Sequence, residues 1–577
     1  MFRKILPYAK KYRKETVWTS LLVLGEVLLE IFIPLLMADM VDKAIPSGEL
    51  AYVIKLGGLM ILMALISLTC GAAAARVASV AGAGFGSDVR AALFNKIQQF
   101  SFANVDRYSK PSLITRLTTD INYIQMTFMM VIRILARGPM MLVSAGIMAY
   151  VMNPRLTPIF VVGILVFSVG MVALFQICYP RLMVMLKKYD GLNAAIQENL
   201  IAIRVVKAFV RADFEKKKFR KANDENMEMS VRCERIMNLQ MPLILLIMYG
   251  SITAVIWFGG QMVIEGSFLT GQMVSFVGYV TQILMSMIMI AQVLVSTIMT
   301  RASITRIGEV LDEQVEILDP PEPAEGYPAV ADGSIEFDHV FFSYHQESEQ
   351  PNLSEINLRI KPGQTVGIIG GTGSAKTSLV QLIPRLYDVT GGSVRVGGRD
   401  VREYRVHDLR EAVSMVLQKN VLFSGTIREN LLWGDAEATQ EEIEAACRAA
   451  QAHDFISAFP DGYNTDLGQG GVNVSGGQKQ RLCIARALLK KPKILILDDS
   501  TSAVDTATDA KIRQAFRENL KDTTKIIIAQ RVSSVSDADQ IIVMDDGRID
   551  AVGTHEELLA TNEIYREVYH SQQKGVA

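Results

Sequence analysis

The chain has 577 residues, of which 50% are hydrophobic and 21% are charged, and its formal net charge is −1. This length allows about two to four domains, and the charge balance alone argues neither for nor against a nucleic-acid partner. The cysteines have no CxxC motif and no paired spacing, so we expect reduced thiols in apolar surroundings and neither a disulfide framework nor a metal site. They are Cys70, Cys178, Cys233, Cys447 and Cys483.

Six apolar stretches in the first half of the chain approach or exceed the ~20 residues that a helix needs to cross a bilayer. They cover residues 17–40, 53–75, 127–152, 156–178, 241–264 and 269–299. The first stretch is too long for a signal peptide and no small-residue cleavage site follows it, so we expect it to remain as a membrane anchor. The last is long enough to continue beyond the bilayer.

Lysine and arginine are concentrated before the first stretch and between the fourth and fifth, whereas the short connections 41–52, 153–155 and 265–267 contain few. Because positive charge stays on the cytoplasmic side, both termini and the two long connections are predicted to be cytoplasmic in a prokaryotic inner membrane. These connections show apolar residues at helical spacing. We therefore expect the membrane helices to extend into the cytosol and to turn near 101–111 and 207–214.

The predicted membrane spans contain five ionisable residues, namely Glu26, Glu30, Asp39, Arg133 and Arg137. A charge at that depth is costly and usually faces a cavity or a partner helix. Two interpretations stay open. The charges contact a cationic or amphiphilic cargo, or they pair between helices and reach toward the membrane surface.

After a charged helical segment at 301–313, three prolines within 320–323 predict an extended linker, which we place at 311–333. From 334 to 577 short β-like runs alternate with amphipathic helices, which is the pattern of an α/β domain. The expected strands include 334–337, 364–369, 393–396, 494–497, 525–529 and 540–544. The predicted fold class is a membrane α-helical domain of six long transmembrane helices (1–310) fused to an α/β domain.

A glycine-rich segment follows an apolar strand of this α/β domain and begins a helix, which is the context of a P-loop. Backbone N–H groups of such a loop surround phosphates, Lys376 is expected to contact the β/γ oxygens, and the Thr377 hydroxyl is placed for Mg²⁺. Ala375 stands where glycine is usual, and its methyl group restricts the backbone. The predicted nucleotide-binding residues here are Gly370, Thr372, Gly373, Ser374, Ala375, Lys376, Thr377 and Ser378.

The motifs that follow are Gln418, Val474-Ser475-Gly476-Gly477-Gln478, Ile494-Leu495-Ile496-Leu497-Asp498 and Ser502-Ala503-Val504-Asp505. In order and spacing the region 334–577 resembles the ATP-binding cassette of ABC transporters. The resemblance implies that Gln418 and Asp498 hold Mg²⁺ together with Thr377, and that Tyr344 stacks on adenine. It also implies that Ser475, Gly476, Gly477 and Gln478 face the γ-phosphate of ATP on the opposite subunit.

A cassette fused behind six spans resembles the half-transporters of the ABC exporter type, in which two chains together make twelve spans. The resemblance implies ATP-driven export of amphiphilic drugs, lipids or peptides, with ATP and Mg²⁺ as cofactors. The expected partners are a second half-transporter chain, membrane lipids and the amphiphilic substrate, without nucleic acid. Short helices at the cytosolic tips are implied to dock on the cassettes.

Two positions depart from the family pattern. Asp499 stands where the family has the Glu that polarises the attacking water, and Gln530 stands where it has a switch His. The Asp side chain is one methylene shorter, so we expect its carboxylate to fall short of that water. These two departures, together with an intact signature motif, favour a heterodimer in which this chain supplies the degenerate ATP site and the partner carries the Glu and His. A homodimer with slow hydrolysis and an ATP-gated regulatory subunit are the alternatives.

Overall fold

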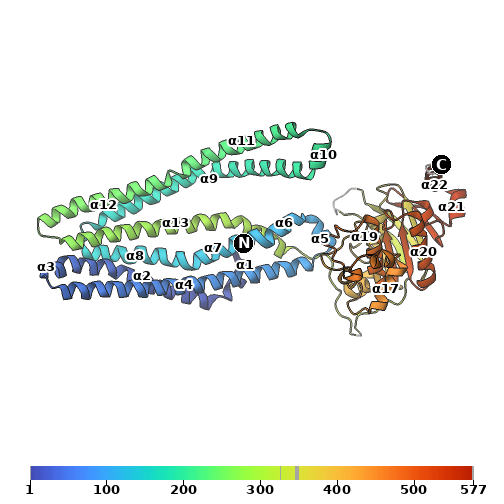
Figure 1. Cartoon of the computed structure of the whole chain (residues 1–577), viewed down its shortest axis with the longest axis horizontal. Coiled ribbons are helices and arrows are strands. Elements are labelled where there is room, and N and C mark those ends of the chain that lie inside the picture. The colour runs from blue at the N-terminus through green and yellow to red at the C-terminus, as the bar shows by residue number, and fades with distance from the viewer. Residues whose placement is uncertain (1, 325, 345–349, 575–577) are drawn as a thin grey trace. The chain divides into compact units, whose positions relative to one another are not determined.

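The computed structural model describes residues 2–324, 326–344 and 350–574. The chain divides into two compact units (Figure 1). The first comprises Met1–Ile97 and Pro111–Asp312, and the second comprises Gln98–Lys110 and Glu313–Ala577. The domain boundaries expected at 310 and 334 remain a prediction.

The first unit is built from helices. Its longer helices are α2 (Arg13–Asp39), α4 (Leu50–Gln98), α8 (Ala136–Met152), α9 (Thr157–Ile201), α11 (Ala212–Met237), α12 (Gln240–Ile264) and α13 (Thr270–Asp312). Its shorter elements are α1 (Phe2–Lys10), α3 (Ile45–Ser47), α6 (Lys110–Thr115), α7 (Ile121–Met130), α10 (Ile203–Ala208) and the π-helical turns η1 (Met40–Ala44), η2 (Arg116–Asp120) and η3 (Val131–Leu135). Within the described residues six helices are long and apolar enough to cross a membrane, and each overlaps one predicted span.

Helices α2, α8 and α13 pack against one another, and α9 runs beside α11 and α12 (Figure 1). The Phe160 and Phe276 rings stack with centroids 4.7 Å apart, which ties α9 to α13. The buried Tyr279 hydroxyl on α13 donates to the Ile31 carbonyl oxygen of α2 at 2.8 Å. Helix α4 has 49 residues and α9 has 45, more than twice the ~20 that a span needs. This confirms the expectation that the spanning helices continue past the bilayer.

Charged residues of the predicted spans pair between helices. Arg137 of α8 donates to Glu26 Oε1 at 2.6 Å and to the two Glu30 carboxylate oxygens at 2.9 and 2.8 Å, both on α2. Asp39 accepts from Lys43 at 2.7 Å. Of the two open interpretations, pairing therefore holds for Glu26, Glu30 and Arg137.

The five cysteines are free thiols, and the sulfur atoms of Cys178 and Cys233 lie 3.8 Å apart.

The second unit contains two sheets. A four-stranded antiparallel sheet has the order β2-β1-β4-β5, and a six-stranded sheet has the order β10-β9-β3-β8-β7-β6. The strands are β1 (Ile335–Phe342), β2 (Leu353–Ile360), β3 (Thr365–Gly370), β4 (Gly391–Val396), β5 (Arg399–Asp400), β6 (Val413–Val416), β7 (Ile494–Asp498), β8 (Thr524–Ile528), β9 (Gln540–Asp545) and β10 (Arg548–Gly553). Each of the six expected strands overlaps one of these, so the predicted fold class is confirmed.

The second unit also contains helices, some of which pack on the six-stranded sheet. They are α14 (Lys376–Gln381), α15 (Val406–Ala412), α16 (Ile427–Leu431), α17 (Gln440–Ala449), α18 (His453–Ser457), α19 (Gly476–Leu489), α20 (Thr506–Asn519), α21 (His555–Thr561) and α22 (Glu563–Lys574). Strand β7 is buried along its whole length, which explains its continuous apolar sequence. Strands β3, β7 and β8 are parallel and in register, with Ile528 opposite both Ile368 and Asp498. Their carboxyl ends therefore meet at one edge of the sheet.

Helix α5 (Phe102–Arg107) belongs to the second unit, although the sequence places it between two membrane helices. Ser101 caps it, and the Asn104 side chain accepts from the Ser101 N–H. The Asn104 amide group then donates to Glu313 Oε1 at 3.1 Å and to the Gln314 carbonyl oxygen at 2.7 Å. The expected turn near 101–111 thus contains a short helix that docks on the α/β unit of the same chain.

The turn between β3 and α14 contains two residues with left-handed backbone conformation. Gly373 has φ +88° and Ala375 has φ +65°. An alanine in this region costs at least about 1 kcal/mol because its Cβ crowds the following carbonyl oxygen, and glycine avoids that clash. The geometry of the turn therefore explains why glycine is usual at position 375.

We predict that Ala375→Gly raises the melting temperature of the second unit by about 2–4 °C, the shift that ~1 kcal/mol produces in a unit of this size. Gly373→Ala is the matched control, because a Cβ there meets no atom within 4 Å and adds only the backbone cost. It should lower the melting temperature. Differential scanning fluorimetry of the detergent-solubilised variants measures both shifts. An unchanged or lower melting temperature for Ala375→Gly would contradict the strain at this position.

Candidate functional site

The P-loop residues gather at the carboxyl end of β3. Lys376 Nζ donates to the carbonyl oxygens of Gly370 and Gly371 at 2.9 and 2.7 Å and to Ser374 Oγ at 3.1 Å, which holds its charge at the centre of the loop. Burial lowers the pKa of Lys376, against the opposing effect of the Asp498 and Asp499 carboxylates. A Cβ on Gly370 would lie 2.1 Å from the Met544 carbonyl oxygen, so only glycine fits there.

A hydroxyl and a carboxylate meet beside this loop. Thr377 Oγ1 donates to Asp498 Oδ1 at 3.0 Å, and Asp498 is only 2% exposed at the end of β7. Burial raises the pKa of Asp498, and the neighbouring Asp499 carboxylate adds to the rise. Mg²⁺ prefers such oxygen ligands and commonly combines one or two carboxylates with substrate phosphates. The Thr377–Asp498 pair fits a Mg²⁺ ion bound together with a nucleotide.

Asp499 follows directly and is held by an amide. Gln530 Nε2 donates to Asp499 Oδ2 at 2.6 Å. Burial raises the pKa of Asp499, while the Gln530 amide and the Gln418 side chain oppose the rise. An imidazole can exchange protons near neutral pH, whereas a primary amide only donates and accepts hydrogen bonds. Gln530 therefore orients the Asp499 carboxylate without itself offering a proton shuttle.

The segment that carries Gln530 is fixed by the C-terminal helix. Gln572 on α22 donates to the Gln530 carbonyl oxygen at 2.7 Å and accepts from the Val532 N–H at 2.9 Å. Sequence reasoning missed Gln572, because a glutamine on an amphipathic helix carries no local signal of this contact. The structure thus adds one positioning residue to the predicted site.

Tyr344 lies beside the start of the P-loop helix. Its hydroxyl is within hydrogen-bonding distance of Ser378 Oγ at 2.9 Å and of Gln381 Oε1 at 3.2 Å, and 41% of the residue is exposed. Thr372 is exposed in the loop itself. An exposed aromatic ring next to a phosphate-binding loop offers a face for stacking on a nucleobase. The structure therefore brings Tyr344, Ser378 and Lys376 to one region.

The signature residues form a second group, at the N-terminus of α19. Ser475 caps this helix by accepting from the Gln478 N–H at 3.3 Å, and Gln478 Oε1 accepts from the Ser475 N–H at 2.9 Å. A Cβ on Gly477 would lie 2.8 Å from the Ala503 carbonyl oxygen, so glycine allows the 502–505 segment to pack closely. Ser475 and Gly476 are exposed. The start of this 14-residue helix suits an anionic phosphate.

Comparison with known proteins covers both units. Residues 17–287 match the family model described as ABC transporter transmembrane region, and residues 353–502 match the one described as ABC transporter. The uncharacterized ABC transporter ATP-binding protein YfiB of Bacillus subtilis (strain 168) is 36% identical over 573 residues, which is 99% of this chain and 98% of YfiB. YgaD of the same organism, whose name gives multidrug export as a provisional role, is 32% identical over 582 residues and 99% of each chain.

An ATP-dependent lipid A-core flippase of Syntrophus aciditrophicus (strain SB) is 32% identical over 518 residues, covering 89% of this chain and 85% of the flippase. The solved structure of a bacterial Atm1-family ABC exporter with ATP bound superposes with a TM-score of 0.82 over 97% of this chain and 98% of that chain. Its sequence identity is 24%, so it shows the shared fold.

Within the described residues, six membrane-length helices and a nucleotide-binding α/β unit occur on one chain, and YfiB matches this chain almost from end to end. The chain therefore belongs to the ABC transporter family as an exporter-type half-transporter, a multi-pass membrane protein whose cassette binds and hydrolyses ATP.

Proposed function

We propose that this chain is one half of a heterodimeric ABC exporter and that its own P-loop forms the degenerate ATP site. The observation that carries the proposal is the Asp499–Gln530 pair, which replaces the residues that activate water while the groups that hold the nucleotide are kept. In this assembly the chain exports amphiphilic molecules across the cytoplasmic membrane. Both termini and the cassette lie in the cytosol, as the lysine and arginine distribution indicates.

The nucleotide-holding residues have distinct roles. The Lys376 ammonium group neutralises the β- and γ-phosphates, and the exposed face of Tyr344 stacks on adenine. Thr377 and Asp498, with Gln418, hold Mg²⁺, which neutralises phosphate charge when bound. The hydrogen bond between Thr377 and Asp498 keeps both oxygens at the same edge of the sheet. These groups are sufficient for tight ATP binding.

Hydrolysis at the same site is expected to be slow. A general base that is correctly placed contributes about 10²–10⁴-fold to a rate. The Asp499 carboxylate is one methylene shorter than Glu, and its Oδ2 already accepts from Gln530 at 2.6 Å. Gln530 cannot take up or release a proton. Neither residue therefore replaces the Glu and His of an active site.

The signature motif argues for a different partner chain. Ser475 and Gly476 are exposed at the start of α19, where they can meet the γ-phosphate of ATP held by a second chain. Two identical chains make two poor sites, whereas a partner with Glu and His completes one competent site with this signature. The intact motif also disfavours a subunit that only binds ATP as a regulator.

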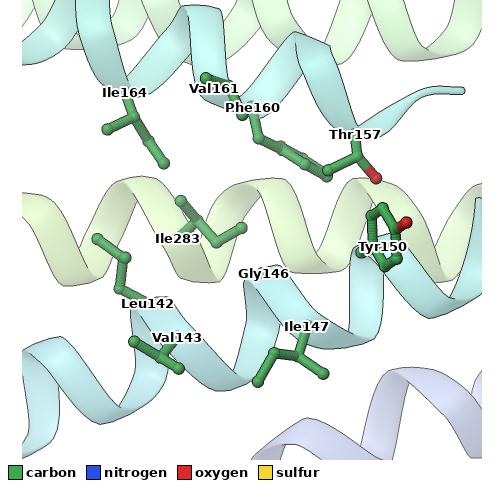
Figure 2. A pocket seen from close by; sticks show the side chains of 10 residues that line it. All are labelled: Leu142, Val143, Gly146, Ile147, Tyr150, Thr157, Phe160, Val161, Ile164 and Ile283. Atoms are coloured by element: carbon green, nitrogen blue, oxygen red, sulfur yellow. The ribbon is translucent and has the colours of Figure 1, made fainter. Parts of the chain in front are cut away.

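An apolar groove supports an amphiphilic substrate. It lies within the first unit between α8, α9 and α13, is open on one side and has a volume of about 380 Å³. Figure 2 shows its lining side chains. Its lining is formed by Leu142, Val143, Gly146, Ile147, Tyr150, Thr157, Phe160, Val161, Ile164 and Ile283. Tyr150 and Thr157 lie at one end, so an alkyl chain can fill the groove with its polar group beside their hydroxyls (Figure 2). The names of the flippase and of YgaD point to the same class of cargo.

We predict that Gly146→Leu weakens binding of the fluorescent amphiphile N-dodecyl dansylamide by about tenfold, because the new side chain occupies part of a hydrocarbon site. A Cβ at Gly146 meets no atom within 4 Å, so the fold tolerates the change. Gly250→Leu on α12 is the matched control, since its Cβ also meets no atom within 4 Å. Fluorescence titration in nanodiscs gives both affinities. An equal loss in the two variants, or none in Gly146→Leu, would remove the groove from the substrate path.

We predict that the double variant Asp499→Glu/Gln530→His raises Mg²⁺-ATP turnover of the purified chain about tenfold or more, because it restores a carboxylate of the right length and a group that exchanges protons. Asp499→Asn is the control and should not exceed the wild-type rate. Phosphate release is measured together with ATP binding on the same sample. Unchanged turnover in the double variant, with ATP still bound, counts against the degenerate-site proposal.

A further inference from the structure

Two cysteines of the first unit face each other across neighbouring helices. Cys178 of α9 and Cys233 of α11 are free thiols, and their sulfur atoms lie 3.8 Å apart. Helices α9 and α11 pack along one another (Figure 1). A disulfide needs its sulfur atoms ~2.05 Å apart, and the remaining gap is smaller than the arc that a thiol sulfur covers between two rotamers. Rotation of the side chains with a small approach of the helices can therefore join the two sulfurs.

The two thiols differ in their exposure. Cys178 is partly exposed, whereas Cys233 is only 1% exposed. An oxidant dissolved in water therefore meets the Cys178 sulfur first, because susceptibility to oxidation follows exposure. The Cys233 sulfur is shielded from solvent but lies next to that of Cys178. In this arrangement one thiol reacts with the oxidant and the second, protected thiol resolves the product.

The pair lies at the predicted cytosolic boundary of the membrane spans. The apolar stretch 156–178 ends at Cys178, and Cys233 comes shortly before the stretch 241–264. Arg181 follows Cys178 by one helical turn, and its Nη1 donates to the Ile177 carbonyl oxygen at 2.6 Å. This hydrogen bond keeps the guanidinium group beside the turn that carries Cys178. A positive charge next to a thiol favours the thiolate, which is the form that reacts with peroxide.

We propose that Cys178 and Cys233 form a reversible thiol–disulfide site that responds to hydrogen peroxide. The Cys178 thiolate attacks one peroxide oxygen and the O–O bond breaks, which gives a sulfenic acid and hydroxide. The Cys233 sulfur then attacks the Cys178 sulfur, the S–O bond breaks and the S–S bond forms. The hydroxyl group leaves with the Cys233 proton as water. Two electrons pass from the sulfurs to the peroxide, and a thiol reductant restores both cysteines by exchange.

The product is a covalent link between two helices. It closes the loop of residues 178–233, which contains α10, and it fixes the register of α9 against α11. The inference is independent of the proposed function, because it involves no group of the ATP site. The other unit contains Cys447 and Cys483, which are both buried. Oxidation of the first pair is therefore expected to leave ATP affinity within about twofold of its initial value.

Peptide mass spectrometry without reduction tests the site. The full chain in lipid nanodiscs is reduced, freed of reductant and treated with hydrogen peroxide. Trypsin cuts after arginine, so the disulfide joins peptide 156–181 to the tripeptide 233–235. We expect this linked peptide, lighter than the sum of its parts by two hydrogen atoms, to become the main product containing Cys178. It should disappear when dithiothreitol is added.

Single variants separate the roles of the two thiols. In Cys233→Ser the sulfenic acid has no thiol to resolve it, so dimedone should label Cys178 about tenfold more than in the wild type. In Cys178→Ser the buried Cys233 should remain unlabelled. Cys70→Ser is the matched control, because Cys70 is a free, partly exposed thiol on α4 of the same unit. This variant should form the link as the wild type does.

Three results would overturn the inference. The first is the absence of the linked peptide at a peroxide concentration that oxidises Cys178. The second is dimedone labelling of Cys178 that does not change between the wild type and Cys233→Ser, since Cys233 would then not resolve the sulfenic acid. The third is a linked peptide found only in chains that run as dimers on a non-reducing gel, because the bond would then join two chains instead of α9 and α11 of one chain.

Discussion

The parallel register of β3, β7 and β8 is the constraint on which the nucleotide site depends. Because Ile368, Ile528 and Asp498 lie opposite one another in neighbouring strands, the P-loop, the two consecutive aspartates and the Gln530 segment all emerge at one sheet edge. The apolar side chains of these strands are buried, so a shift of one residue would move them out of the core and separate the site residues at the same time. The same packing that stabilises the sheet therefore sets the distances at which the site works.

Two non-glycine residues at this edge have left-handed backbones, Ala375 with φ +65° and Asp499 with φ +48°. Such conformations are costly for residues with a Cβ and persist where the surrounding structure enforces them. At Ala375 the loop must curve around Lys376, and at Asp499 the chain must leave β7 while its N–H still donates to the Ile528 carbonyl oxygen at 3.1 Å. Backbone strain and nucleotide chemistry thus coincide in the site, while the strands behind it stay regular.

Much of the fold could be predicted from local sequence, because membrane helices and buried strands depend on runs of apolar residues. The P-loop and Asp498 could also be predicted from the sequence, since glycine spacing and strand context are local features. Contacts between residues far apart in the sequence could not be predicted. Gln572, which holds Gln530, has no local signal, and α5 packs with the cassette although its neighbours in sequence are membrane helices. The pairing of Glu26, Glu30 and Arg137 stayed open for the same reason.

ATP turnover by the purified wild-type chain alone, with nucleotide binding measured on the same sample, tests the central claim most directly. The nucleotide-holding residues predict tight binding, near one ATP per chain. An Asp499 carboxylate held by Gln530 predicts turnover well below the ~1 s⁻¹ at the slow end of ordinary enzymes. Turnover at or above about 1 s⁻¹ would contradict the account, because Asp499 and Gln530 would then suffice for hydrolysis and no partner with Glu and His would be needed.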